Sequence, residues 1–305
     1  MIAKIRKKIK EILMPTIYEA SVIANDKQMF HIVAGQMRNL CLYCNDCGIT
    51  EDKLANAEVV VSLTTYGKRL YEVYLTIESI MQGTMKPNRI VLWLEESLKE
   101  IELPLYLQKQ QKRGLEVRYC KDIRSYKKLI PSLMMFPDSI IVTIDDDVIY
   151  EPDMLEKMVN SYNNDCHHIY ANRVNRMSLN AIGKPKRYLE WSIVKDNVAS
   201  PLNFFTGVGG VLYPPHCFID EVNNEQAFMS LAPCGDDIWF YAMSLLKGYT
   251  ISKVYTHNAN GNDFLVNESV QDVSLYHVNT EGENLNDKQI MAVFDKYNIY
   301  KCLKE

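Results

Sequence analysis

The stretch Ser139-Ile140-Ile141-Val142-Thr143-Ile144-Asp145-Asp146-Asp147 decides the fold that we expect for this chain. Its first six residues are mostly β-branched and apolar, which is typical of a buried strand. The three aspartates should then emerge at the carboxyl edge of a sheet, where open α/β sheets bind ligands. Adjacent carboxylates repel one another, and a divalent cation would neutralise them. A solvated turn is the alternative, but it accounts for one aspartate better than for three.

The 305-residue chain is 47% hydrophobic and 24% charged, so we expect one large α/β domain or two smaller ones rather than disorder. The net charge of -4 gives no overall basic field, and we expect no nucleic-acid partner. No run of about 18 uncharged apolar residues predicts a membrane span. Because Glu11, Pro15 and Glu19 interrupt the first apolar stretch, we expect no signal peptide and a cytoplasmic protein with reduced cysteines.

The first 14 residues predict a basic amphipathic helix that Pro15 ends, with Ile2, Ile5 and Ile9 at helical spacing among lysines. Two placements are equally compatible with this pattern. The helix could contact an anionic membrane, at the inner face of the cell membrane, or it could pack its isoleucines on the protein.

Three cysteines in the next segment, Cys41, Cys44 and Cys47, have overlapping C-x-x-C spacings. Zinc needs four ligands, and His31 is the nearest candidate for the fourth. We favour ordinary buried thiols over a metal site, and leave metal binding by these cysteines open.

Strand-like and helical segments alternate from residue 58 onward. The runs at 59–64, 89–94 and 115–119 read as strands, and the stretch near 125–135 reads as a helix. This order predicts a mostly parallel central sheet with right-handed crossovers, flanked by helices.

A second acidic cluster stands at Asp236 and Asp237, where a helix that Gly248 stops is expected to begin. The helix macrodipole favours negative charge at this end. Capping alone explains one of the two aspartates.

Together, the two clusters resemble the GT-A glycosyltransferases of the family 2 type, a bacterial surface-polysaccharide type, over roughly residues 58–250. Four segments carry the resemblance: Val61–Tyr66, Glu78–Gln82, the D-x-D region Asp145–Asp153, and Gly209–Leu212 leading to Asp236-Asp237. It implies a GT-A, Rossmann-like fold with an N-terminal helical extension over 1–57. Residues 58–155 would bind the nucleotide sugar, and residues 156–305 would bind the acceptor and carry catalysis.

The resemblance also implies roles in binding a nucleotide-diphosphate sugar, most often a UDP-sugar. Thr64, Thr65 and Tyr66 would lie along the nucleoside, and Arg69 near the phosphates. Glu95 or Glu96 would read the uracil ring, with Asp122 as a second candidate, and Lys128 would supply a basic group.

For the metal and the chemistry, the resemblance implies Asp147 as the direct ligand of Mg²⁺ or Mn²⁺. Asp145 could share the metal, and Asp145 or Asp146 could touch the ribose or a metal-bound water. Asp237, with Asp236 in second place, matches the family's base, which removes the acceptor hydroxyl's proton and gives inversion.

The chain departs from the family pattern, with Asp-Asp where many relatives have Glu-Asp and without the usual acceptor signature. We therefore expect a glycan or lipid-linked acceptor without further detail. Two histidines, His257 and His277, are candidate late metal ligands, although structural roles are favoured. Four aromatic residues are candidates either for sugar stacking or for the core: Trp191, Phe204, Phe205 and Trp239.

Two other functions fit the acidic clusters less well. A haloacid-dehalogenase-type phosphohydrolase would have its aspartate strand early in the chain, and it wants another acid where Phe240 stands. A non-catalytic carbohydrate-binding relative would not need a base such as Asp237.

Overall fold

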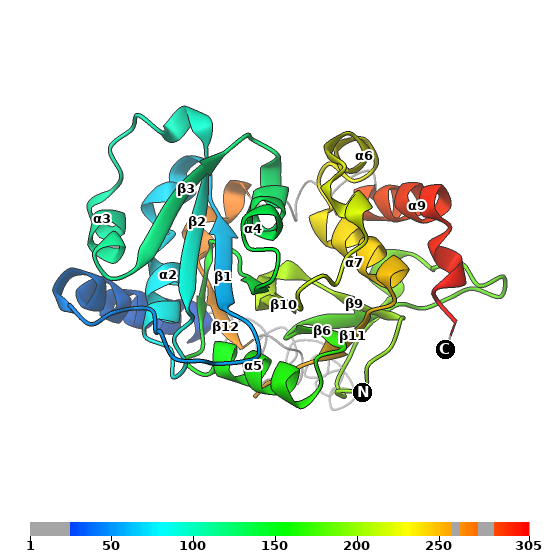
Figure 1. The fold of residues 1–305 in the computed structure, drawn as a ribbon, viewed down its shortest axis with the longest axis horizontal. Helices are drawn as coiled ribbons and strands as arrows, with labels where there is room; N and C mark the ends of the chain where they lie inside the picture. The colour runs from blue at the N-terminus through cyan, green and yellow to red at the C-terminus, as the bar shows by residue number, and fades with distance from the viewer. Residues whose placement is uncertain (1–24, 258–262, 274–283, 305) are drawn as a thin grey trace, which may run out of the picture.

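The computed structural model describes residues 25–257, 263–273 and 284–304, and Figure 1 shows their course. The predicted basic helix over residues 1–14 and His277 both lie outside these ranges. None of the helices in the described ranges combines the length and the apolar character that crossing a bilayer requires.

A seven-stranded sheet in the order β11-β6-β10-β4-β1-β2-β3 forms the centre of the molecule. Its neighbours pair in parallel, except that β10 runs antiparallel to both β4 and β6. The predicted mostly parallel α/β sheet flanked by helices is therefore confirmed. The strands are β1 (Val59–Thr64), β2 (Arg89–Glu95), β3 (Leu115–Cys120), β4 (Ile140–Thr143), β6 (His168–Ala171), β10 (Val211–Tyr213) and β11 (Thr250–Lys253).

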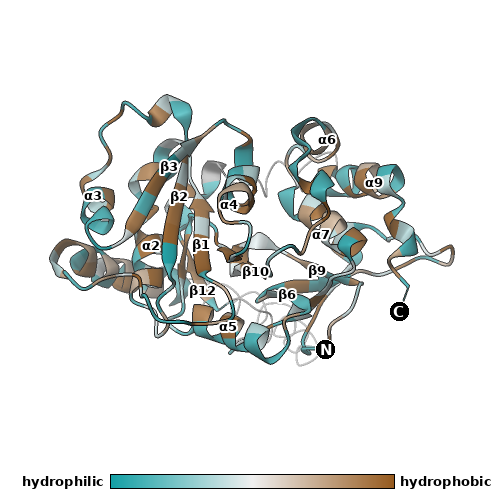
Figure 2. Cartoon of the chain, viewed as in Figure 1, coloured by the Kyte–Doolittle hydropathy of each residue, from teal (hydrophilic) through white to brown (hydrophobic). Residues whose placement is uncertain are grey.

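Alternate residues of the central strands belong to two separate hydrophobic cores, one on each face of the sheet. Val60 of β1 packs in one core and Val61 in the other. Both faces are covered, which explains why β1 and β4 read as continuous apolar runs. Figure 2 shows hydrophobic residues along β1 and along its neighbour β2.

Helices cover both faces. Residues of α2, α3 and α5 belong to the Val61 core, and residues of α4, α6, α7 and α9 belong to the Val60 core or pack against it. The helices are α2 (Tyr74–Met81), α3 (Leu105–Gln111), α4 (Ile130–Met135), α5 (Met154–Asn164), α6 (Glu225–Leu231), α7 (Asp236–Lys247) and α9 (Leu285–Tyr297).

The expected N-terminal extension contains a helix over residues 25–43, in a segment where the sequence shows no clear period. Phe30, Ala34 and Cys41 of this helix are buried, while Met29 and Ile32 are exposed. Exposed apolar residues beside buried ones blur the amphipathic pattern, which is why the sequence did not indicate this helix.

Two of the three cysteines of this segment bond to backbone carbonyls. Cys41 Sγ donates to Tyr106 O at 3.6 Å and Cys47 Sγ to Arg113 O at 3.7 Å. Within the described residues they belong to no group of metal-ligating side chains. All eight cysteines of the chain are free thiols.

Two small sheets lie at the carboxyl edge of the central sheet. The strand after the aspartates, β5 (Val148–Tyr150), pairs antiparallel with β12 (Phe264–Val266). The second sheet joins β7 (Val174–Arg176) to β8 (Ser192–Ile193) and β9 (Asn203–Phe205). The first pairing brings a late segment of the chain, the 3-10 helix Glu268–Val273, next to the aspartate triplet.

Candidate functional site

One open cavity of about 1870 Å³ lies at the carboxyl edge of the central sheet. Its lining contains Glu95 but neither the alternative Glu96 nor His257. The other predicted site residues in the lining come from both halves of the chain: Thr64, Thr65, Tyr66, Arg69, Asp122, Lys128, Asp145, Asp146, Asp147, Asp236 and Asp237. The topology explains this gathering, because β1 and β4 are parallel neighbours whose ends meet at one edge.

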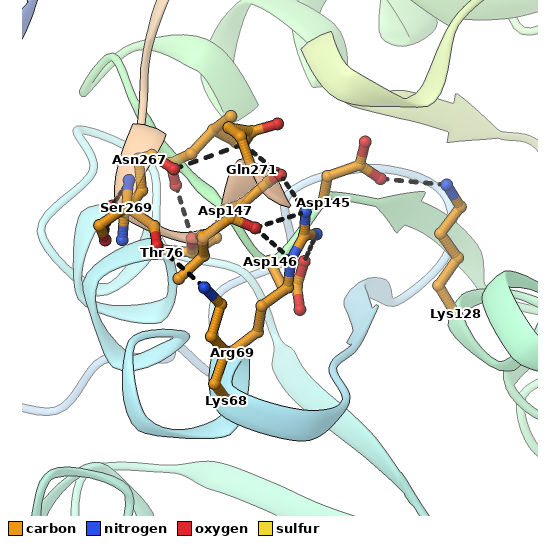
Figure 3. Close-up of polar contacts among 12 residues, drawn as sticks. Lys68, Arg69, Thr76, Lys128, Asp145, Asp146, Asp147, Asn267, Ser269 and Gln271 are labelled. Atoms are coloured by element: carbon orange, nitrogen blue, oxygen red, sulfur yellow. Dashed lines mark hydrogen bonds and ion pairs between the residues drawn. The ribbon is translucent and has the colours of Figure 1, made fainter. Parts of the chain in front are cut away.

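Arg69 binds two of the three consecutive aspartates (Figure 3). Its Nη1 lies 2.8 Å from Asp146 Oδ1, and its Nη2 lies 3.0 Å from Asp147 Oδ2. The three side chains are about nine-tenths buried. We call them the Arg69 cluster.

The segment after β12 covers the Arg69 cluster. Gln271 Nε2 donates to Asp147 Oδ2 at 2.8 Å, and Arg69 donates to Val270 O at 3.3 Å. The amide of Asn267 donates to Asp147 O at 2.8 Å. Asp147 is thus held by a side chain and a backbone group that lie more than 100 residues later in the sequence.

Lys128 binds the remaining aspartate of the triplet. Its Nζ lies 3.0 Å from Asp145 Oδ1 and 3.0 Å from Asp236 Oδ2, the latter as an ion pair without hydrogen-bond geometry. Lys128 is buried, whereas the Asp145 side chain is 29% exposed. We call Lys128, Asp145, Asp236 and Asp237 the Lys128 cluster.

Gly207 brings Asp237 into the Lys128 cluster. Its amide donates to Asp237 Oδ2 at 3.0 Å, which leaves Asp237 Oδ1 buried without a partner. A Cβ at Gly207 would lie 2.7 Å from Lys128 Nζ, 3.3 Å from Asp237 Oδ1 and 3.4 Å from Asp145 Oδ1. The missing side chain therefore leaves the space in which these charged groups meet.

Burial and like charge shift the pKa values of the acidic residues. Burial raises the pKa of Asp146 to about 6, against the opposing effect of Arg69. Burial and then Asp145 raise the pKa of Asp147. Burial and then Asp236 raise the pKa of Asp237, while Lys128 opposes the rise. For Lys128, burial lowers the pKa, but Asp145 and the two helix aspartates outweigh it and raise the pKa well above its ordinary value.

The residues expected to bind the nucleoside surround a more exposed part of the cavity. Thr64 Oγ1 donates to Trp93 O at 2.8 Å, Thr65 is buried, and Tyr66 is exposed with the Arg69 guanidinium 5.7 Å from its ring centre. Glu95 accepts a hydrogen bond from Ser97. The side chain of Asp122 accepts from Lys127 and from the Arg124 amide, which lowers its pKa, mainly through Lys127.

The aromatic candidates divide between the core and the cavity. Trp239 and Phe205 are fully buried and do not line the cavity, which makes them core residues. Trp191 and Phe204 are also mostly buried, but both line the cavity wall. Phe240, where a phosphohydrolase would need an acid, is fully buried in the core.

The donor set fits a hard divalent cation. The carboxylates of Asp145 and Asp147 are oxygen ligands of the kind that Mg²⁺ and Mn²⁺ prefer, and Asp146 Oδ2 is buried without a hydrogen-bond partner. Asp147 is at present bound by Arg69 and Gln271, so a cation there would share or displace these contacts.

His257 lies with Glu151 and Asp153, and these three form the one group of metal-ligating side chains found among the described residues. The ammonium of Lys157 lies 2.9 Å from Asp153 Oδ1 and 3.5 Å from Glu151 Oε2. This lysine already supplies the positive charge that the group needs.

Two residues of the site were missed by the sequence reasoning, Gln271 and Gly207. The Gly-rich run around Gly207 was a visible signal, although it does not say which glycine meets the charged groups. Nothing in the local sequence marks Gln271, because its partner Asp147 lies 124 positions away.

Comparisons with known proteins show low similarity. No family model and no curated protein matches the chain. The chain is similar to solved structures of CMP:2-keto-3-deoxy-manno-octonic acid synthetase with CTP (11% identity, 65% of this chain and 89% of that chain, TM-score 0.37). It is also similar to a mannosyltransferase from Pyrobaculum calidifontis with GDP-Man and Mn²⁺, at 12% identity over 77% of this chain and 66% of that chain, with a TM-score of 0.42. A third similar structure is HddC from Yersinia pseudotuberculosis with GMP-PN, at 13% identity over 53% of this chain and 78% of that chain, with a TM-score of 0.34. At these TM-scores the likenesses assign neither a family nor a ligand to this chain.

Proposed function

We propose that this protein is a metal-dependent, inverting glycosyltransferase that moves a sugar from a nucleotide-diphosphate sugar to a glycan or lipid-linked acceptor. A UDP-sugar is the donor that we expect first. The observation that carries the proposal is the meeting of two acidic clusters in one cavity, with Asp145 and Asp237 both close to the Cβ position of Gly207. This arrangement supports a metal-binding group for the diphosphate with a proton acceptor close to it.

Each cluster has one part of the chemistry. Asp147 and Asp145 would hold the Mg²⁺ or Mn²⁺ ion, which when bound supplies positive charge for the diphosphate leaving group. Asp237 accepts the proton of the acceptor hydroxyl while the hydroxyl oxygen attacks the anomeric carbon, and the bond to the diphosphate breaks with its electron pair. Attack opposite the leaving group inverts the anomeric carbon.

The arrangement supports Asp237 over Asp236 as the base. Asp236 is already neutralised by Lys128 at 3.0 Å, whereas Asp237 Oδ1 has no partner and its pKa is raised. A carboxylate with a raised pKa is a stronger base, which favours transfer of the proton from the acceptor hydroxyl to Asp237.

The test is to incubate the purified protein with Mn²⁺ and a panel of sugar nucleotides and to measure release of nucleoside diphosphate. Phosphatase activity on p-nitrophenyl phosphate is measured in parallel. We expect nucleotide release that EDTA and Asp147→Ala abolish, and NMR should show a product anomer opposite to that of the donor. Phosphate release without nucleotide release would overturn the proposal.

A further inference from the structure

One arginine of the cavity, Arg173, has no side-chain partner among the residues that the structure describes. Arg173 follows β6 in the second half of the chain and lines the cavity. Its side chain makes no hydrogen bond or ion pair with any residue of the described ranges, and its Nε is buried from solvent. A buried donor without an acceptor is costly, so a ligand that supplies one would be bound favourably.

The other cationic residues of the cavity already have partners. Arg69 and Lys128 each pair with two aspartates. Lys127 pairs with Asp122 and Lys27 with Glu268, and Arg124 donates to Pro233 O at 3.3 Å. Arg124 is bonded to a carbonyl rather than to a carboxylate, but it is exposed. Among the described residues of this lining, Arg173 is the cation whose side chain has neither a hydrogen bond nor an ion pair and whose donor is buried.

The backbone of Arg173 is fixed beside the proposed base. The amide of Thr206 donates to Arg173 O at 3.1 Å, and the next residue, Gly207, donates to Asp237. A Cβ at Gly209 would lie 3.1 Å from Arg173 N, so the two chain segments are in close contact. Arg173 thus belongs to the half of the cavity that carries Asp237.

The neighbouring lining residues suit a sugar or a lipid chain. Tyr188 and Trp191 lie with their ring centres 5.0 Å apart, and Asn175 donates to the Tyr188 hydroxyl at 3.4 Å. Aromatic faces beside one free guanidinium form a surface for a ligand that is apolar in one part and anionic in another.

We propose that Arg173 binds an anionic group of the acceptor, a phosphate or a carboxylate, next to the hydroxyl that is glycosylated. This inference rests on the proposed function, because the acceptor is defined by the transfer reaction. An acidic sugar and a lipid-linked phosphate would both supply the required oxygen atoms, and arginine binds either one through paired hydrogen bonds.

The experiment measures binding of matched probes to the full chain in the presence of UDP and Mn²⁺, which occupy the donor half. One arm compares methyl glucuronide with methyl glucoside, and the other compares hexyl phosphate with hexanol. We expect the anion to bind at least roughly tenfold more tightly than its neutral match in one arm, as for a charge-assisted hydrogen bond. A preference in the carboxylate arm indicates an acidic sugar, and one in the phosphate arm a lipid-linked phosphate.

Arg173→Gln should abolish the preference for the anion, and Arg173→Lys should keep part of it. The control is Arg187→Gln, at an exposed position, which should keep all of the preference. UDP affinity should stay unchanged within about twofold in all three variants. A variant with lost UDP affinity would place Arg173 in the donor half and overturn the inference. Binding of UDP without any anion preference would overturn the inference alone. Failure of the wild-type protein to bind any nucleotide would overturn the proposed function together with it.

Discussion

The Arg69 cluster and the Lys128 cluster divide three consecutive aspartates between them and differ in their balance of charge. Arg69 faces two carboxylates, both well buried, and a late segment of the chain covers them. Lys128 faces three, from Asp145, Asp236 and Asp237, and one of these has an oxygen without a partner. The excess of negative charge is therefore larger in the Lys128 cluster, which is where a proton acceptor is useful.

This difference indicates separate tasks for two regions that the sequence places side by side. The Arg69 cluster has one cation against two carboxylates and is closed, as suits a rigid support for a metal and a diphosphate. The Lys128 cluster is open at Asp145 and has surplus charge, as suits chemistry on a hydroxyl. Changes in the two clusters should therefore affect different measurements.

The largest effect is expected from Asp237→Asn, which removes the proposed proton acceptor but keeps the shape of the side chain. We expect kcat to fall by about 10³, within the range of about 10²–10⁴ for general-base catalysis, while UDP affinity is preserved. Asp220→Asn, at an exposed position, is the control and should leave kcat unchanged. An equal loss of UDP affinity would contradict the division between the clusters.

Lys128→Met should lower stability, because it leaves the carboxylates of Asp145 and Asp236 without the ammonium that pairs with both. We expect the free energy of unfolding to fall by about 3 kcal/mol, measured by urea denaturation. The control is Lys121→Met, whose exposed pair with Glu225 should be worth less than about 1 kcal/mol. Equal losses in the two variants would show that Lys128 does not bind the cluster together.

Gly207→Ala should have a smaller effect, since its Cβ would meet the end of a side chain rather than backbone. Because Lys128 Nζ lies 2.7 Å from that Cβ position, the lysine must move away from Asp145 or Asp236. We expect a loss of about 1–2 kcal/mol in the free energy of unfolding. Gly35→Ala, in the helix over residues 25–43 with open space around it, is the control and should not destabilise the protein.

The mildest perturbation is a change of pH on the unmodified protein. A base acts only when deprotonated, so activity is lost as pH falls through the raised pKa of Asp237. The acid limb of the kcat/KM profile should therefore lie at higher pH than the ordinary aspartate value of about 3.9. A limb at that ordinary value would show that a different group, or Asp237 in another environment, accepts the proton.

Much of the fold followed from local patterns. The strand at residues 59–64 and the helix from Asp236 to Lys247 have the bounds that the sequence predicted. Both are strong cases, a continuous β-branched run in the first and an acidic start with a terminal glycine in the second. The helix over residues 25–43 escaped prediction because its exposed apolar residues obscure the buried stripe.

The gathering of the candidate residues in one cavity was also predictable from the sequence, since polar residues that follow parallel strands lie at one edge of the sheet. The ion pairs that these residues form with one another were not predictable from the sequence. Lys128 joins the triplet to Asp236, and Arg69 binds Asp146 and Asp147, contacts that the sequence did not indicate. The roles expected of these two residues toward the donor stay predictions.

The order of residues along the chain thus determined the strands, the helices and the edge at which the aspartates emerge, because these depend on neighbours a few positions apart. The direction in which each aspartate faces was decided by tertiary structure. Asp146 meets Arg69 across 77 positions, and Asp147 meets Gln271 across 124. Residues that follow one another beyond a strand end turn to different sides, and the partner found on each side depends on how distant segments pack.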